Sequence, residues 1–110
     1  MKPLRLVLTD HWFEEIKSGR KKSEYRLDTP YWLKRLKPYL DGVEFMGIDP
    51  DFWAEFAPTV IFQKAYRKNP ETMQFEIENI IWLGNGYNTD LKTNNSVFEI
   101  KLGRRIKWNR

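Results

Sequence analysis

Cysteine is absent from this sequence of 110 residues, and histidine occurs once, as His11. Without cysteine the chain has no disulfide bond, no zinc–thiolate site and no thiol nucleophile. A single imidazole just before an apolar helix face is typical of a surface or capping residue. We therefore expect no metal site and no cofactor.

Long apolar runs are absent as well. No stretch approaches the about 18 consecutive apolar residues of a membrane-spanning helix, and the N-terminal segment lacks the apolar run of a signal peptide. Together with the lack of cysteine, this pattern fits a reducing compartment. We expect a cytoplasmic protein without a membrane partner, and the sequence does not indicate its oligomeric state.

The chain is instead rich in positive charge and in aromatic rings. Its length is that of one domain, 1–110, with a single core. The formal net charge of +4 and the pI near 9.4 favour an anionic partner, because a basic surface attracts phosphate groups. Aromatic residues make up 15% and include five tryptophans. These rings either fill a small core or stack on bases.

Residue patterns in the N-terminal part predict alternating strands and helices. Asp10 fits a helix N-cap, and Gly19 is suited to ending that helix because glycine readily takes positive φ. Pro30 fits the first position of a second helix, which Pro38 is expected to stop. The predicted elements are a strand over 4–8, a helix over 10–19, a strand over 23–26 and a helix over 30–38.

The middle of the chain is harder to assign, and the C-terminal half is rich in strands. Residues 43–46 fit a short strand, and Asp49-Pro50 fits the start of a capped helix. We interpret 43–57 as an insertion whose aromatic residues either close the fold or present an apolar patch to a protein partner. The remaining predicted elements are strands over 59–66, 72–83 and 96–102, with a polar loop over 84–90.

Residues 12–26 carry the strongest functional signal. They combine a short helix, a glycine, a cationic turn and a strand of alternating charge, a composition that suits a polyanion better than a core. The order resembles the start of the ASCH domains, relatives of the PUA fold. The matching residues are Trp12-Phe13 with Ile16, Ser18-Gly19-Arg20-Lys21-Lys22 and Glu24-Tyr25-Arg26. Residues Pro30-Tyr31-Trp32 and Lys34-Arg35-Leu36 resemble a small subset of that family encoded by bacteria and phages.

This resemblance implies an α+β fold: a small antiparallel β-barrel with two or three short helices packed at its openings. It also implies a cleft lined by the lysine turn. Family members are thought to bind RNA or nucleotides, some are reported as ribonucleases, and one small relative is an amidohydrolase acting on an acetylated cytidine. Lys21 matches that enzyme's lysine, Glu24 holds the position of its threonine, and Asp90 lies near the position of its distant glutamate.

The candidate catalytic residues are Lys21 and Glu24. Side chains alternate along a strand, so Lys22, Glu24 and Arg26 form one row, which Lys21 joins only through a turn or bulge. Glu24 is either a salt-bridged strand residue or a general acid or base, and Arg26 either binds a phosphate or pairs with Glu24 or Asp28. The candidate residues for binding a nucleotide or nucleic acid are Arg20, Lys21, Lys22, Tyr25, Arg26, Tyr66 and Tyr87.

Three hypotheses for function follow. The first is an RNA- or nucleotide-binding module, with a basic tail over 103–110 that is either a solvated end or an arm along a phosphate backbone. The second is a ribonuclease or an amidohydrolase of a modified nucleoside that uses Lys21 and Glu24. The third is a phage-type interaction or inhibitor module that binds a protein partner through Phe52 and Trp53.

Overall fold

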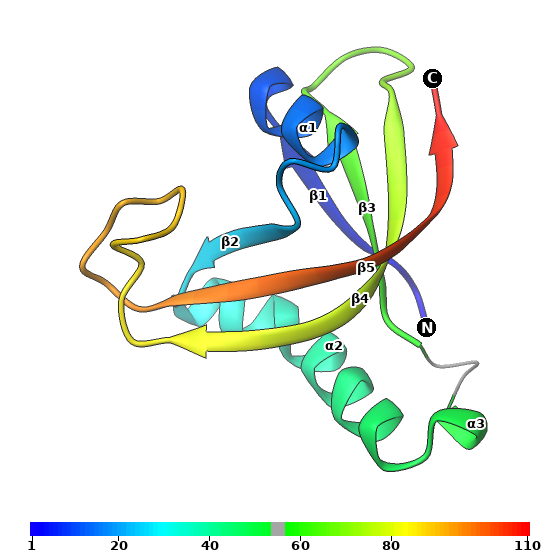
Figure 1. Cartoon of the computed structure of the whole chain (residues 1–110), viewed down its shortest axis with the longest axis vertical. Helices are drawn as coiled ribbons and strands as arrows, with labels where there is room; N and C mark the ends of the chain where they lie inside the picture. Colours follow the sequence, from blue (N-terminus) through cyan, green and yellow to red (C-terminus); the bar gives the residue numbers. More distant parts are fainter. Residues whose placement is uncertain (54–56) are drawn as a thin grey trace.

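The computed structural model describes residues 1–53 and 57–110, apart from the side chains of residues 52 and 53. Its helices and strands follow one another along the chain as shown in Figure 1. They are β1 (Leu4–Leu8), α1 (Asp10–Lys17), β2 (Ser23–Leu27), α2 (Pro30–Ile48), α3 (Pro50–Trp53), β3 (Thr59–Lys64), β4 (Thr72–Leu83) and β5 (Val97–Asn109).

The strands form one five-stranded sheet in the order β1-β3-β4-β5-β2. β1 and β3 run parallel, because α1, β2 and α2 lie between them in the chain and allow a crossover, while the other pairs are antiparallel. The α+β class is therefore confirmed. The expected antiparallel β-barrel is not, since the sheet is mixed and its end strands β1 and β2 are not paired to close it.

The long strands β4 and β5 bend and cross near the middle of the molecule, with α1 and α2 at opposite ends of the sheet (Figure 1). The core lies where the apolar faces of these elements meet. In β1 the leucines at 4, 6 and 8 are buried and alternate with more exposed neighbours, as the period of a strand requires. Phe13 and Ile16 add the apolar face of α1, and Leu36 adds that of α2.

The helix α2 differs most from the prediction. It continues through Pro38 to Ile48, so the expected stop at Pro38 and the expected strand over 43–46 are both wrong. Proline removes one backbone hydrogen bond of a helix, whereas Leu36, Leu40 and Val43 recur at helical spacing and pack in or against the core. Packing of the apolar face therefore outweighs the local preference of proline.

The last strand is longer than predicted. β5 runs to Asn109 rather than 102, because β4 pairs with it as far as Thr72↔Asn109 across several register shifts. The segment interpreted as a basic tail is thus largely the C-terminal half of a strand. Among the described residues, no helix has the combination of length and apolar character needed to span a membrane.

Candidate functional site

The turn after α1 brings Lys21 to the start of β2. Gly19 has a φ of +84°, a left-handed conformation that glycine adopts without a steric penalty. The Gly19 N–H donates to the Ile16 carbonyl at 3.1 Å, and the Lys21 N–H donates to the Glu15 carbonyl at 3.0 Å. Because β2 begins only at Ser23, the alternation of side chains along the strand does not include Lys21. The turn allows the Lys21 side chain to reach Glu24.

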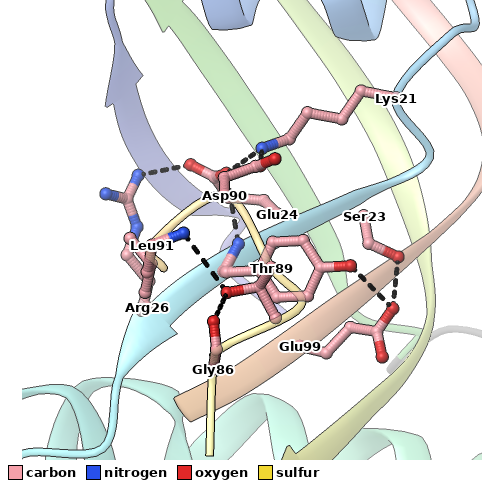
Figure 2. Close-up of polar contacts among 10 residues, drawn as sticks. Lys21, Ser23, Glu24, Arg26, Gly86, Thr89, Asp90, Leu91 and Glu99 are labelled. Carbon is pink, nitrogen blue, oxygen red and sulfur yellow. Dashed lines mark hydrogen bonds and ion pairs between the residues drawn. The ribbon is translucent and has the colours of Figure 1, made fainter. Parts of the chain in front are cut away.

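A network of opposite charges forms around Glu24. The Lys21 ammonium lies 2.9 Å from Glu24 Oε1, and an Arg26 guanidinium nitrogen lies 2.9 Å from Glu24 Oε2. Lys21 also binds the carboxylate of Asp90, as Figure 2 shows. The side chains of Lys21 and Glu24 are only 9% and 7% exposed, whereas that of Asp90 is 26% exposed. Asp90 is therefore the carboxylate of the network that solvent, or a ligand, reaches most readily.

The loop between β4 and β5 holds Asp90 in place. The Thr89 hydroxyl is buried, donates to the Gly86 carbonyl at 2.8 Å and accepts the Leu91 N–H at 3.2 Å (Figure 2). Gly86 also pairs with Thr93 as an isolated β-bridge. A Cβ atom at Gly86 would lie 2.7 Å from a Val97 methyl group, so the loop closes only with glycine there. Hydrogen bonds within the loop therefore fix the position of Asp90.

A pocket of about 460 Å³ opens beside Lys21. This volume falls within the range of small-ligand sites. The Lys21 ammonium lies 4.4 Å from the centre of the Trp12 ring and 5.5 Å from that of Tyr25, so an ammonium sits against two aromatic rings. The pocket is lined by Trp12, Glu15, Arg20, Lys21, Lys22, Ser23, Tyr25 and Asp90.

Polar contacts at the rim fix Tyr25 and Arg20. Burial, with the nearby Glu99 carboxylate, raises the pKa of Tyr25 above its usual 10.0. The neutral Tyr25 hydroxyl lies 3.4 Å from Glu99, and the Ser23 hydroxyl donates to Glu99 at 2.8 Å. Arg20 donates to Glu15 at 2.8 Å, and this hydrogen bond holds the pKa of Glu15 below its usual 4.5. The rim therefore combines a neutral phenol with an arginine–carboxylate pair.

Of the candidate binding residues, Arg20, Lys21, Lys22 and Tyr25 line the pocket. Glu24 is the buried salt-bridged strand residue of its first interpretation, and Arg26 pairs with it. The alternative partner of Arg26, Asp28, instead accepts hydrogen bonds from Trp82 and Ser96.

The two outlying tyrosines do not join the pocket. Tyr66 is 88% exposed beyond the end of β3, and Tyr87 is 65% exposed in the loop that carries Asp90. Neither is among the residues that line the pocket. A resemblance to a family and a position in or beside a loop do not fix which way a side chain points.

Sequence reasoning missed the acidic residues that organise the rim. Glu99 meets Tyr25 because the two are direct partners across β2 and β5, and this register is not visible in either segment alone. Glu15 meets Arg20 through the turn at Gly19. Only the position of that turn could have linked this glutamate to the cationic segment.

The structure says less about a metal site, about His11 and about the predicted partner residues Phe52 and Trp53. Among the described residues, no group of three or more histidine, cysteine, aspartate or glutamate residues could hold a metal ion. The His11 ring instead packs edge-on against Trp12, with 4.5 Å between ring centres. Phe52 and Trp53 belong to α3 by their backbone, and their side chains lie outside the described part of the chain.

Comparison with known proteins adds no relative: no protein-family model, curated protein or solved structure matches the chain. The resemblance to the ASCH domains consequently stays a prediction from residues 12–36. The geometry of the pocket carries the functional argument.

Proposed function

We propose that this chain binds a nucleotide, either free or as an unpaired residue of RNA, in the pocket beside Lys21. The observation that carries the proposal is the joint presence of two aromatic rings, an ammonium and an accessible carboxylate in one cavity of about 460 Å³. Aromatic rings bind the faces of bases, and each such contact is worth about 1–3 kcal/mol. The chain would then be an ASCH-like module in function as well as in its motif.

The polar groups divide between the two ends of a nucleotide. Arg20 and Lys22 are exposed at the rim, and no ion pair of Lys22 with a carboxylate occurs among the described residues. They are suited to a phosphate, which guanidinium and ammonium groups bind well. Asp90 and Lys21 lie deeper, where a carboxylate accepts from the amino group of a base and an ammonium donates to a carbonyl or ring nitrogen.

The resemblance draws attention to the same pair of residues. In the amidohydrolase relative a distant glutamate works with the lysine of the cationic turn; the nearest acid to that position here is Asp90, and Asp90 contacts Lys21. These two residues are far apart in the sequence, so the motif of residues 12–26 does not by itself bring them together. The departure at Glu24 gives the lysine a second carboxylate in place of a hydroxyl.

The direct test is a calorimetric titration of the protein with AMP, CMP, GMP, UMP and a short single-stranded RNA, repeated at several salt concentrations. We expect saturable binding that Tyr25→Ala weakens by about 1–3 kcal/mol, while Tyr25→Phe keeps the ring and loses little. Lys22→Gln should lower the slope of log affinity against log salt for the RNA by about one.

Lys34→Gln is the matched control, because it removes the same charge from α2, outside the pocket lining. Equal effects of Lys22→Gln and Lys34→Gln would mean that the net charge, and not this pocket, attracts the ligand. Absence of saturable binding to every nucleotide and to the RNA would refute the proposal.

A second candidate function is hydrolysis of a modified nucleoside or of RNA, favoured by the placement of Lys21 between two carboxylates. For an N-acylated nucleoside, Asp90 takes a proton from the water that attacks the acyl carbon, and the Lys21 ammonium stabilises the oxyanion that forms. The C–N bond then breaks as protonated Asp90 returns the proton to the leaving nitrogen, while Glu24 holds Lys21 in position. Pure protein should then release the acyl group from an N-acylated nucleoside, and Lys21→Met and Asp90→Asn should each abolish turnover. Turnover that survives both changes comes from another site or a contaminant.

A further inference from the structure

The C-terminal half of β5 has one open edge. β4 accompanies β5 over its full length, whereas β2 pairs only with Val97–Lys101. The pairing on the β2 side ends where the Leu102 N–H donates to the Lys22 carbonyl at 3.1 Å. Beyond that point, in the part of the chain that the structure describes, no strand pairs with the outer edge of 103–109 (Figure 1).

An open edge presents main-chain N–H and C=O groups in alternation. Over seven residues this edge is about 23 Å long, enough for a short added strand. Native sheets usually cover or shorten such edges, because they are templates for another strand. The backbone of a second polypeptide supplies both the acceptors and the donors that the edge needs, whereas the phosphates of a polynucleotide supply only acceptors.

The side chains along this edge indicate that the partner is negatively charged. Residues 104–110 include four cations, Arg104, Arg105, Lys107 and Arg110. Among the described residues only Arg104 has a carboxylate partner, Glu76 at 3.1 Å. The guanidinium groups of Arg105 and Arg110 lie 5.6 and 5.1 Å from the centre of the Trp108 ring, so a positively charged aromatic surface remains. A second copy of this edge would bring like charges together, which opposes pairing of the chain with itself.

We propose that the outer edge of residues 103–109 binds an acidic, extended polypeptide segment by strand addition. The main-chain groups select an extended peptide, and the unpaired cations select acidic side chains. This surface is separate from the nucleotide pocket, since none of residues 103–109 lines it. The proposal therefore does not depend on nucleotide binding.

The test uses three synthetic ten-residue peptides and a single-stranded RNA. The first peptide alternates Glu and Val, the second has the same side chains with N-methyl groups on alternate residues, and the third replaces Glu by Lys. Hydrogen exchange of the 110-residue chain is monitored by NMR. We expect the acidic peptide alone to bind saturably and to slow exchange of main-chain amides within 103–109, because N-methylation removes the donors that strand addition requires.

A charge-reversal variant tests the second half of the proposal. Arg105→Glu with Lys107→Glu should weaken binding of the acidic peptide about tenfold or more, while Lys34→Glu with Lys92→Glu, the same change elsewhere on the surface, should alter it little. Equal binding of the N-methylated peptide would reduce the interaction to charge attraction and overturn strand addition. Protection of the same amides by RNA but not by the acidic peptide would overturn the choice of partner.

Discussion

Two cationic segments, residues 20–26 and 104–110, lie in opposite environments. Each contains four lysine or arginine residues. Among the described residues, three cations of the first segment are paired with carboxylates and one of the second segment is. The first segment faces β5 and the loop that carries Asp90, both of which supply acids, whereas the second borders an open edge. Charge density along a chain therefore says little about function until the neighbouring strands are known.

The contrast also separates two ways of using positive charge. At Lys21 the charges are buried together with their acids, and the network fixes geometry inside a pocket. Removing Glu24 would take one carboxylate from the buried Lys21 and a carboxylate partner from Arg26, and such a loss costs far more than an exposed pair contributes. Along 104–110 the charges remain in water, where they contribute little to folding and are available to a partner. Stability measurements should therefore distinguish the two segments sharply.

The largest effect is expected from Glu24→Ala. This change leaves Lys21 and Arg26 without the carboxylate that both contact, and we expect it to reduce the free energy of unfolding by about 3 kcal/mol in urea denaturation. Glu76→Ala is the matched control for the other segment, because this β4 residue is the partner of exposed Arg104, and its loss should cost less than about 1 kcal/mol. Similar losses of unfolding free energy in the two variants would contradict the distinction between a buried charge network and a solvated ion pair.

A smaller effect is expected at the loop that presents Asp90. In Gly86→Ala the new methyl group meets Val97, Thr93 and Thr89 at 2.7 to 3.1 Å, and relief of this overlap requires the loop to shift. We expect a loss of about 2 kcal/mol and weaker nucleotide binding, because Asp90 moves away from Lys21. Gly84→Ala has only a Trp82 ring atom at 3.8 Å and should be tolerated. If Gly86→Ala binds nucleotides normally, Asp90 is not needed in the pocket.

Part of the fold was predictable, and the reason is local. The leucine alternation of 4–8, the glycine that ends the first helix and the strand over 72–83 all depend on residues close in sequence, and these elements are confirmed. The run of α2 through Pro38 was not predictable, because packing of Leu40 and Val43 against the core decides it.

The arrangement of the site depended on longer-range contacts. Asp90 was not among the predicted site residues, being only the acid nearest to the position of the relative's glutamate, and its approach to Lys21 requires closure of the loop around Gly86. The partnership of Tyr25 with Glu99, and the open edge of β5, are properties of pairs of strands. Neither property can be deduced from the residues of one segment alone. The sequence pattern of 103–110 therefore could not distinguish a solvated tail from a strand with an unpaired edge.

An intermediate effect is expected where the second segment is anchored to the fold. Glu71 accepts from the Trp108 indole N–H at 2.6 Å and lies 2.8 Å from the Lys17 ammonium. Burial acts to raise the pKa of Glu71, but the hydrogen bonds from Lys17 and Trp108 outweigh it and bring the pKa below its usual 4.5. We expect Glu71→Gln to cost about 1 kcal/mol at neutral pH, with allowance for its partial exposure.

The pH dependence of this variant has a definite sign. A carboxylate whose pKa is lowered by folding stabilises the protein at pH values above 4.5, and this contribution is lost as the pH falls through the lower, folded value. The difference in unfolding free energy between the wild type and Glu71→Gln should therefore shrink on acidification. Exposed Glu78→Gln serves as the control, and a difference that persists below the folded pKa would show that the effect is one of packing.

The smallest effect is expected from neutralising the open edge itself. Arg105→Gln with Lys107→Gln should change the free energy of unfolding by less than about 0.5 kcal/mol, because both side chains are exposed and no carboxylate pairs with either among the described residues. Arg26→Gln, which leaves the buried Glu24 with one cation fewer, should cost clearly more. If neutralising residues 105 and 107 destabilises the chain as strongly as Arg26→Gln, these cations already have a structural partner. The edge would then not be available to a second chain.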